Sequence, residues 1–196
     1  MSDSLFDPED DAATPLEAEE REQLIPTYIT VRSELNEAEQ INIADADRWA
    51  FSRKRNVLDA GFLRTLHKRM FGNVWRWAGQ YRTTARNIGV DAYRIGTDLA
   101  AHIDDVTFWI ENETYELDEI VARFHHRLVQ IHPFPNGNGR HGRLAADLLA
   151  KQLGVERFTW GSKSGADSKT IRDDYVAALR AADEHNIETL KTFVRS

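Results

Sequence analysis

The sequence predicts a mainly α-helical fold, and two observations carry that prediction. Over most of the chain from Ile29 onward, apolar residues recur at steps of three and four, the spacing of one face of an α-helix. Segment 79–95 is the exception, because it holds two glycines, two threonines and two tyrosines without that spacing. We therefore expect a helical bundle with one small β-hairpin.

The first three expected helices lie on either side of this hairpin. Residues 33–53 are rich in helix-forming residues and contain neither glycine nor proline. Residues 59–71 carry large apolar side chains at helical spacing. Residues 97–112 show the same spacing, and Thr97 has the short hydroxyl side chain that suits a helix N-cap.

The remaining helices make up most of the second half of the chain. Residues 117–131 carry a clean apolar stripe, and Pro133 prevents that helix from continuing. Residues 138–153 restart a helix that Gly154 ends. Two further helices are expected at residues 168–184 and 187–194.

The length of 196 residues suits one domain with a short extension. Residues 1–28 are predicted to form an acidic N-terminal arm, in which Pro8 and Pro15 interrupt helix propagation. Residues 29–196 are predicted to form the domain itself.

Composition excludes several classes of function. The formal net charge is -7, so the chain lacks the basic excess that neutralises phosphates, and we expect no direct nucleic-acid binding. It has no cysteine, which excludes disulfides, cysteine-ligated metals and thiol nucleophiles. No apolar run reaches the length of a membrane-spanning helix and the start does not resemble a signal peptide, so we expect a cytoplasmic protein without membrane contact.

One segment, HPFPNGNGRHGR at residues 132–143, carries most of the chemical signal. A helix is expected to end at His132 and another to begin near Asn138, with glycines between them. Glycine lets a backbone approach an anion closely, and a helix start directs unpaired N–H groups toward it. Arg140 and Arg143 lie three residues apart, so they share one face of the new helix.

An imidazole at the edge of such a cradle is placed to exchange a proton near neutral pH. The simpler interpretation is a glycine-rich turn with solvated arginines, in which Arg143 pairs with Asp147 four residues further along the helix. The order of His, Phe, Gly, Asn and Arg within twelve residues favours the functional interpretation.

This segment resembles the signature of the Fic family (filamentation induced by cyclic AMP), HxFx[D/E]GNGRxxR. Every defined position matches except Asn136, where the family carries Asp or Glu. The resemblance covers roughly residues 30–194 and includes WAGQYR at residues 77–82. Together with SELNEAEQINI upstream, these variants look most like the subgroup called mobile mystery protein B. The resemblance implies a Fic-type helical bundle with a small β-hairpin flap beside the active site.

The resemblance implies that the chain transfers AMP from ATP to a Ser, Thr or Tyr hydroxyl of a target protein. His132 would be the general base and Phe134 the buried anchor of the loop. The anion cradle and the contacts to the β- and γ-phosphates would come from Gly137, Asn138, Gly139, Arg140 and Arg143.

Mg²⁺ with ATP is the cofactor that the resemblance implies. Asn136, the residue at the position of the family's metal-binding acid, is a weak ligand for this ion. The family acid binds Mg²⁺ through a carboxylate, whereas an amide oxygen brings no negative charge. We expect weaker recruitment of Mg²⁺ and either slow AMP transfer or a shifted reaction.

Two further elements of the family map onto this chain. The flap that docks the target as an added strand would include Asn87, Ile88, Gly89 and Ile95, although a purely structural hairpin is an equal alternative. The inhibitory glutamate would be Glu34, in the pattern that begins at Thr30 and fits the family motif incompletely, and it would pair with Arg143. The simpler alternative is that Glu34 is a solvated helix residue.

Other functions stay open beside AMP transfer. The neutral residue at 136 would also fit a catalytically weak Fic fold that acts as a binding partner in a toxin–antitoxin-like or mobile-element module, beside a helix-turn-helix protein. Removal of AMP and a homodimeric state are further alternatives that the resemblance allows. A zinc site is disfavoured, because the adjacent His125 and His126 face different sides of a helix and His141 lacks a paired carboxylate.

Overall fold

The computed structural model describes Leu5 and residues 15–196, and within that part the fold is mainly helical, as predicted. The acidic arm therefore lies partly outside the described residues. The α-helices are α1 (Ala18–Arg21), α2 (Arg32–Phe51), α3 (Ala60–Phe71), α4 (Ile95–Glu111), α5 (Leu117–Ile131), α6 (Asn138–Leu153), α7 (Ser168–Asp183) and α8 (Ile187–Arg195), with a 3₁₀ turn η1 (Ala92–Arg94) before α4.

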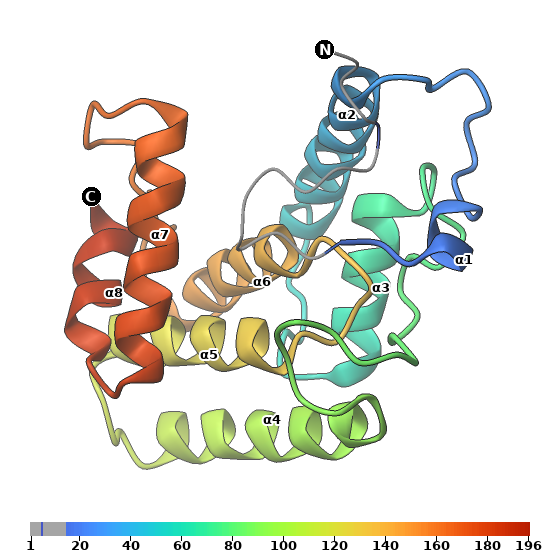
Figure 1. Ribbon diagram of the computed structural model, residues 1–196. Helices are drawn as coiled ribbons and strands as arrows, with labels where there is room; N and C mark the ends of the chain where they lie inside the picture. The colour runs from blue at the N-terminus through green and yellow to red at the C-terminus, as the bar shows by residue number, and fades with distance from the viewer. Residues whose placement is uncertain (1–4, 6–14) are drawn as a thin grey trace.

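Helices α5 and α6 form the centre of the fold, and the other helices are arranged around them (Figure 1). α4 and α8 contact α5, α3 and α2 contact α6, and α7 packs on α8. Gly142 allows the close contact between α5 and α6, because a Cβ there would lie 2.9 Å from Val129 Cγ2. The turn that joins the two central helices is thus held in the middle of the molecule.

The starts of α3, α4 and α7 differ in how they are capped, and the cap predicted for α4 at Thr97 is not formed. α4 begins at Ile95 directly after η1, with Arg94 at the N-cap, so Thr97 lies inside the first turn. α3 and α7 begin with side-chain caps, in which Asp59 accepts from Phe62 N and Asp167 accepts from Thr170 N.

The predicted β-hairpin at residues 79–95 is wrong. In the described residues the only β-type pairing is a single bridge between Leu24 and Trp75, and segment 79–95 runs as turns before η1. The reason is the side chain of Arg82, which donates to the carbonyl oxygens of Thr84 and Val90 and so occupies acceptors that a second strand would need.

The described part of the N-terminal arm is attached to this same region. Ile25 N donates to the Val74 carbonyl at 2.8 Å, and Trp77 Nε1 donates to the Glu20 carbonyl at 3.3 Å. The arm therefore packs beside the segment that follows α3.

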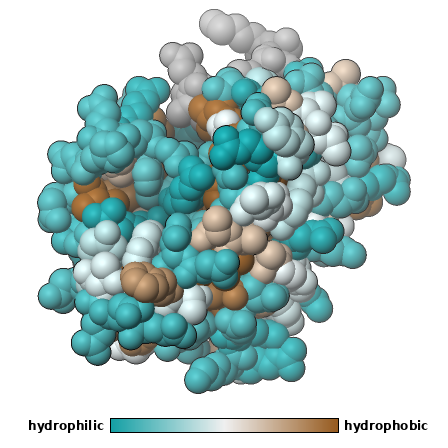
Figure 2. All heavy atoms as spheres, turned by 90° about the horizontal axis from the view of Figure 1, so that it is seen from below, coloured by the Kyte–Doolittle hydropathy of each residue, from teal (hydrophilic) through white to brown (hydrophobic). Residues whose placement is uncertain are grey.

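The face of the molecule shown in Figure 2 is mostly polar. On the face shown in Figure 2, hydrophilic side chains dominate and hydrophobic ones gather only in small separate groups. Among the described residues, no helix combines the length and apolar character needed to cross a membrane.

Asp147 provides a test of the fold. This carboxylate on α6 is 2% exposed and accepts from Arg157 Nε at 2.6 Å and Trp160 Nε1 at 2.9 Å. We expect Asp147→Ala to lower the free energy of unfolding by about 2–3 kcal/mol, because it leaves both donors without their acceptor. Urea unfolding measures this change.

The matched control is Asp173→Ala, which removes an exposed ion pair with Lys169 on α7 and should leave the unfolding midpoint unchanged. Equal effects of the two substitutions would contradict the role given to Asp147.

Candidate active site

A cavity of about 700 Å³ opens beside the turn between α5 and α6. Its lining comes from α2, the segment before η1, the end of α5, the turn itself, the first two turns of α6, and α7. Most of the residues that the sequence predicts for the site are lining residues, namely Asn87, Ile88, Gly89, His132, Asn136, Gly137, Asn138, Gly139, Arg140 and Arg143.

The turn uses two left-handed backbone conformations. His132 ends α5 with φ 54° and ψ 61°, and Gly137 precedes α6 with φ 78°. A Cβ at Gly137 would lie 2.6 Å from Phe71 Cζ, so only glycine fits there without displacing an aromatic ring. Gly137, Asn138 and Gly139 all line the cavity, so the start of α6, where N–H groups lack intrahelical partners, adjoins it.

Three buried side chains, those of Phe134, Asn138 and His67, hold the turn in place. Asn138 clamps Phe134, because its Oδ1 accepts from Phe134 N at 2.9 Å and its Nδ2 donates to Phe134 O at 2.8 Å. The Phe134 ring is fully buried and stacks on His67, with ring centroids 3.7 Å apart. His67 Nδ1 accepts from Gly79 N at 3.0 Å, so Nε2 carries the proton and donates to the Asn136 carbonyl at 3.0 Å.

The two motif arginines have different surroundings. Arg140 pairs with Glu39 on α2 and lies over the Phe71 ring at 4.9 Å. Arg143 lies over the Tyr175 ring at 5.1 Å, and burial lowers the pKa of its guanidinium. The alternative pairing of Arg143 with Asp147 is not formed as a hydrogen bond, since Asp147 accepts from Arg157 and Trp160.

His132 is 5% exposed at the bottom of the cavity. Burial, followed by the positive charge of Arg82, lowers the pKa of its imidazole to about 4. The ring is therefore neutral at pH 7 and able to accept a proton.

The structure places Glu34 at the start of α2. Its carboxylate accepts from Thr30 N at 2.8 Å, and these backbone contacts lower the pKa of Glu34. Glu34 thus caps its own helix, and the carboxylate that pairs with a motif arginine, Arg140, is that of Glu39. Glu39 is 6% exposed and also accepts from Trp75 Nε1 at 2.7 Å.

The predicted flap residues separate into two groups. Asn87, Ile88 and Gly89 lie along the cavity, and a Cβ at Gly89 would lie 2.7 Å from the Cβ of His132. Ile95 is fully buried in the first turn of α4, so its side chain belongs to the core.

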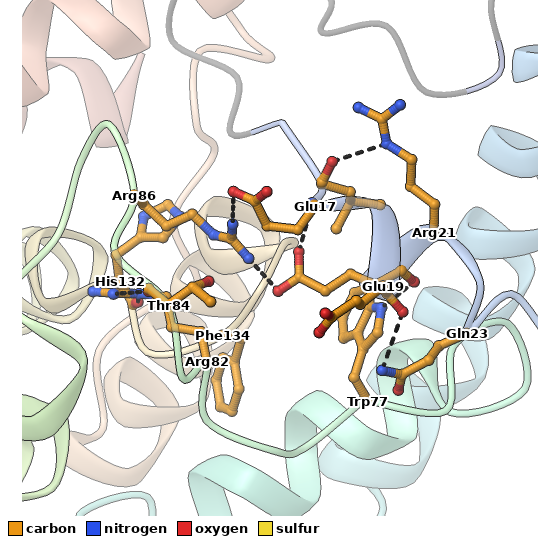
Figure 3. A network of polar contacts seen from close by, with 12 residues as sticks. Glu17, Glu19, Arg21, Gln23, Trp77, Arg82, Thr84, Arg86, His132 and Phe134 are labelled. Atoms are coloured by element: carbon orange, nitrogen blue, oxygen red, sulfur yellow. Dashed lines mark hydrogen bonds and ion pairs between the residues drawn. The ribbon is translucent and has the colours of Figure 1, made fainter.

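Figure 3 shows the residues that hold this segment in place. Arg86 forms ion pairs with Glu17 at 3.0 Å and with Glu20, and its side chain is 1% exposed. Arg82 lies beside His132 and Thr84 in the same view. The acidic arm therefore contacts the segment that borders the candidate base.

Sequence reasoning missed Glu39, Arg82 and His67. A signal for Glu39 was present, because it continues the buried stripe of α2 that begins at Leu35 and includes Ala46. For Arg82 and His67 only a three-dimensional arrangement shows the role, since their partners lie about 50 and 70 residues away.

Comparisons with known proteins agree with this geometry. The Fic/DOC family profile matches residues 57–150, which include α3, α4, α5 and most of α6. The chain is 28% identical over 148 residues to protein adenylyltransferase fic-1 of Caenorhabditis elegans and 30% identical over 137 residues to protein adenylyltransferase Fic of Nematostella vectensis. These matches cover 74% and 66% of this chain but only 27% and 30% of the relatives, so the chain spans less than a third of their length.

Solved structures share the fold. BepC, a VirB-translocated effector of Bartonella tribocorum solved with bound AMPPNP, superposes with a TM-score of 0.68 at 17% identity over 91% of this chain and 97% of that chain. Fic-1 of C. elegans gives a TM-score of 0.65 at 22% identity over 88% of this chain and 50% of that chain. Because both identities are below 25%, the similarity to these structures shows the fold alone.

Proposed function

We propose that this chain, whose residues 57–150 form a Fic/DOC family domain, is a protein adenylyltransferase that transfers AMP from ATP to a hydroxyl side chain of a target protein. The observation that carries the proposal is that a neutral, buried His132, the start of α6 and both Arg140 and Arg143 line one cavity. The names of the curated relatives support the same activity.

The geometry supports a one-step displacement. The N–H groups at the start of α6 would hold the α-phosphate, and Arg140 and Arg143 would hold the pyrophosphate that leaves. The target hydroxyl oxygen attacks the α-phosphorus, its proton passes to His132, and the bond to the β-phosphate oxygen breaks. The protein supplies positioning and charge stabilisation, with no covalent enzyme intermediate.

Mg²⁺ would enter this site mainly as part of the ATP complex. The protein offers it one neutral oxygen, Asn136 Oδ1, which accepts from Gly137 N at 2.6 Å and has Arg140 Nη2 at 3.5 Å. Because Mg²⁺ prefers carboxylate and phosphate oxygens, these surroundings fit it poorly, and the phosphates would supply the charged ligands.

We also propose that the chain inhibits itself, and that the inhibitory residue is Glu39 rather than Glu34. Glu39 holds Arg140 in the position where a phosphate would be bound, so a nucleotide that engages Arg140 fully has to displace it. Glu39 lies on α2, the helix that also carries Glu34, for which the resemblance implies the inhibitory role.

Several finer assignments complete the proposal. The sequences SELNEAEQINI and WAGQYR support the mobile mystery protein B subgroup and, with it, a helix-turn-helix partner protein. A cytoplasmic location stays the expectation from the lack of a signal-peptide-like start. The segment at Asn87–Gly89 would dock the target beside His132, with turns rather than a hairpin as its backbone. Homodimer formation is a further part of the same inference.

A catalytically weak binding partner is the second candidate function. The neutral Asn136 favours it, because the position that brings a metal-binding carboxylate in the Fic signature brings none here. AMP removal would use the same cavity, with Glu39 orienting a water molecule.

The activity can be tested by incorporation of label from α-labelled ATP into the chain itself and into lysate proteins. Replacement of the base in His132→Gln should lower incorporation by about 100-fold or more while ATP still binds. His185→Asn, on an exposed turn between α7 and α8, is the control and should label like the wild type. Equal labelling of all three proteins would leave the binding-partner function.

Inhibition can be tested by comparing two glutamates on α2. We expect Glu39→Ala to raise AMP incorporation by about tenfold or more, since it frees Arg140 for phosphate, and Glu34→Ala to leave incorporation unchanged. Glu39→Gln keeps an acceptor for Trp75 without the charge and should activate similarly. Activation by the Glu34 substitution alone would reverse the assignment.

The metal dependence can be tested by restoring the family carboxylate. Asn136→Asp should lower the Mg²⁺ concentration for half-maximal incorporation by roughly tenfold, because one added charge at contact distance is worth about 1–4 kcal/mol. Asn136→Ala removes the oxygen without adding charge and is the matched control. A Mg²⁺ titration that is the same for Asn136→Asp and the wild type would show that this position does not recruit the ion.

A further inference from the structure

The side chain of Arg82 contacts the backbone of the candidate base, His132. It comes from the segment after α3, is 2% exposed, and donates from Nε to the His132 carbonyl at 2.7 Å. Its other nitrogens donate to backbone carbonyls on both sides, namely those of Thr84, Val90 and Ile131. One planar guanidinium thus connects the end of α5 to the segment beside the cavity.

These bonds fix a backbone conformation that a histidine does not adopt readily. His132 lies in the left-handed region, where a side chain with a Cβ is disfavoured by about 1–2 kcal/mol. Arg82 holds the peptide groups on both sides of this residue, because its guanidinium donates to the carbonyl oxygens of Ile131 and His132. Its backbone N–H also donates to the Pro133 carbonyl at 3.0 Å. The direction of the Cα–Cβ bond of His132 is set by that conformation.

The charge of Arg82 acts on the same ring. After burial, Arg82 is the largest cause that lowers the pKa of His132, and Arg86 contributes less. Other charged or titratable groups face the cavity from the remaining elements, namely Arg32 and Glu39 of α2, His126 of α5, Arg140 and Arg143 of α6, and Arg172, Tyr175, Arg180 and Asp183 of α7.

We propose that Arg82 is the positioning residue of His132: it fixes the left-handed turn that aims the imidazole, and its charge disfavours the imidazolium so that the ring stays ready to take the hydroxyl proton. The proposal rests on the proposed function. It assigns to Arg82 two effects, geometry and charge, that different substitutions separate.

Two substitutions of Arg82 separate its effect on geometry from its effect on charge. Arg82→Lys keeps a positive charge but loses the planar fork, and Arg82→Gln keeps an amide donor but loses the charge. The pKa of His132 is read by NMR titration of ¹³C-labelled histidine, assigned with His132→Gln, so this readout does not require activity. Thermal melts establish that each variant is folded.

In Arg82→Gln we expect the pKa of His132 to rise by about one unit, since a nearby like charge is removed. A base with a raised pKa is protonated at higher pH, so the acid limb of the kcat profile should move upward by the same amount. In Arg82→Lys the pKa should stay near the wild-type value, whereas kcat falls by about 10- to 100-fold with little change in KM for ATP, because the ring is misaligned.

Arg86→Met is the matched control, since Arg86 lies on the same segment but bonds to Glu17 and Glu20, and its effect on the His132 pKa should be smaller. A His132 pKa that is the same in folded Arg82→Gln and wild type, or an undiminished kcat in Arg82→Lys, would overturn the proposal. If no variant transfers AMP but the pKa still rises in Arg82→Gln, the proposed function fails and the effect of Arg82 on His132 stands.

Discussion

The structure depends on the shape of the turn between α5 and α6, which leads into the first turn of α6. Two of its residues adopt left-handed conformations and one of them is a histidine, so the turn does not hold this shape by itself. Stability therefore comes from side chains of other segments that bond to its carbonyl oxygens. His67 holds Asn136, and Arg82 holds His132 and the residues on either side.

A second constraint follows from charge. Arg140 and Arg143 begin a helix whose dipole already places positive potential at that end, so an apo site needs a counter-charge. Glu39 provides it from α2, and the contact also joins α2 to α6. Under the proposed function, the residue that balances these charges is also the one that a polyphosphate would replace, so the stability of the fold and its inhibition would share one contact.

The sequence predicted those features of the fold that are determined by residues close together in the chain. The helices follow from apolar periodicity, and the turn at 132–143 follows from its glycines and arginines, so the mainly helical fold is confirmed. The hairpin at 79–95 was wrong because a side chain from within that segment, Arg82, takes the carbonyl oxygens that strand pairing would use. Helical spacing indicates that Glu39 is buried, but the partners of Glu39 and His67 could not be assigned from spacing, since they lie about 70 to 100 residues away.

Under the proposed function, the neutral Asn136 would change how charge is balanced when a nucleotide binds. A polyphosphate would enter a cavity lined by Arg140, Arg143 and Arg172, with Glu39 as the acid that contacts the first of them. A carboxylate at 136 would repel the phosphates and require Mg²⁺ between them, whereas an amide does neither. Under the proposed function, the amide would therefore move the neutralisation of the phosphates from the metal toward the arginines, and displacement of Glu39 would become the step on which nucleotide binding most depends.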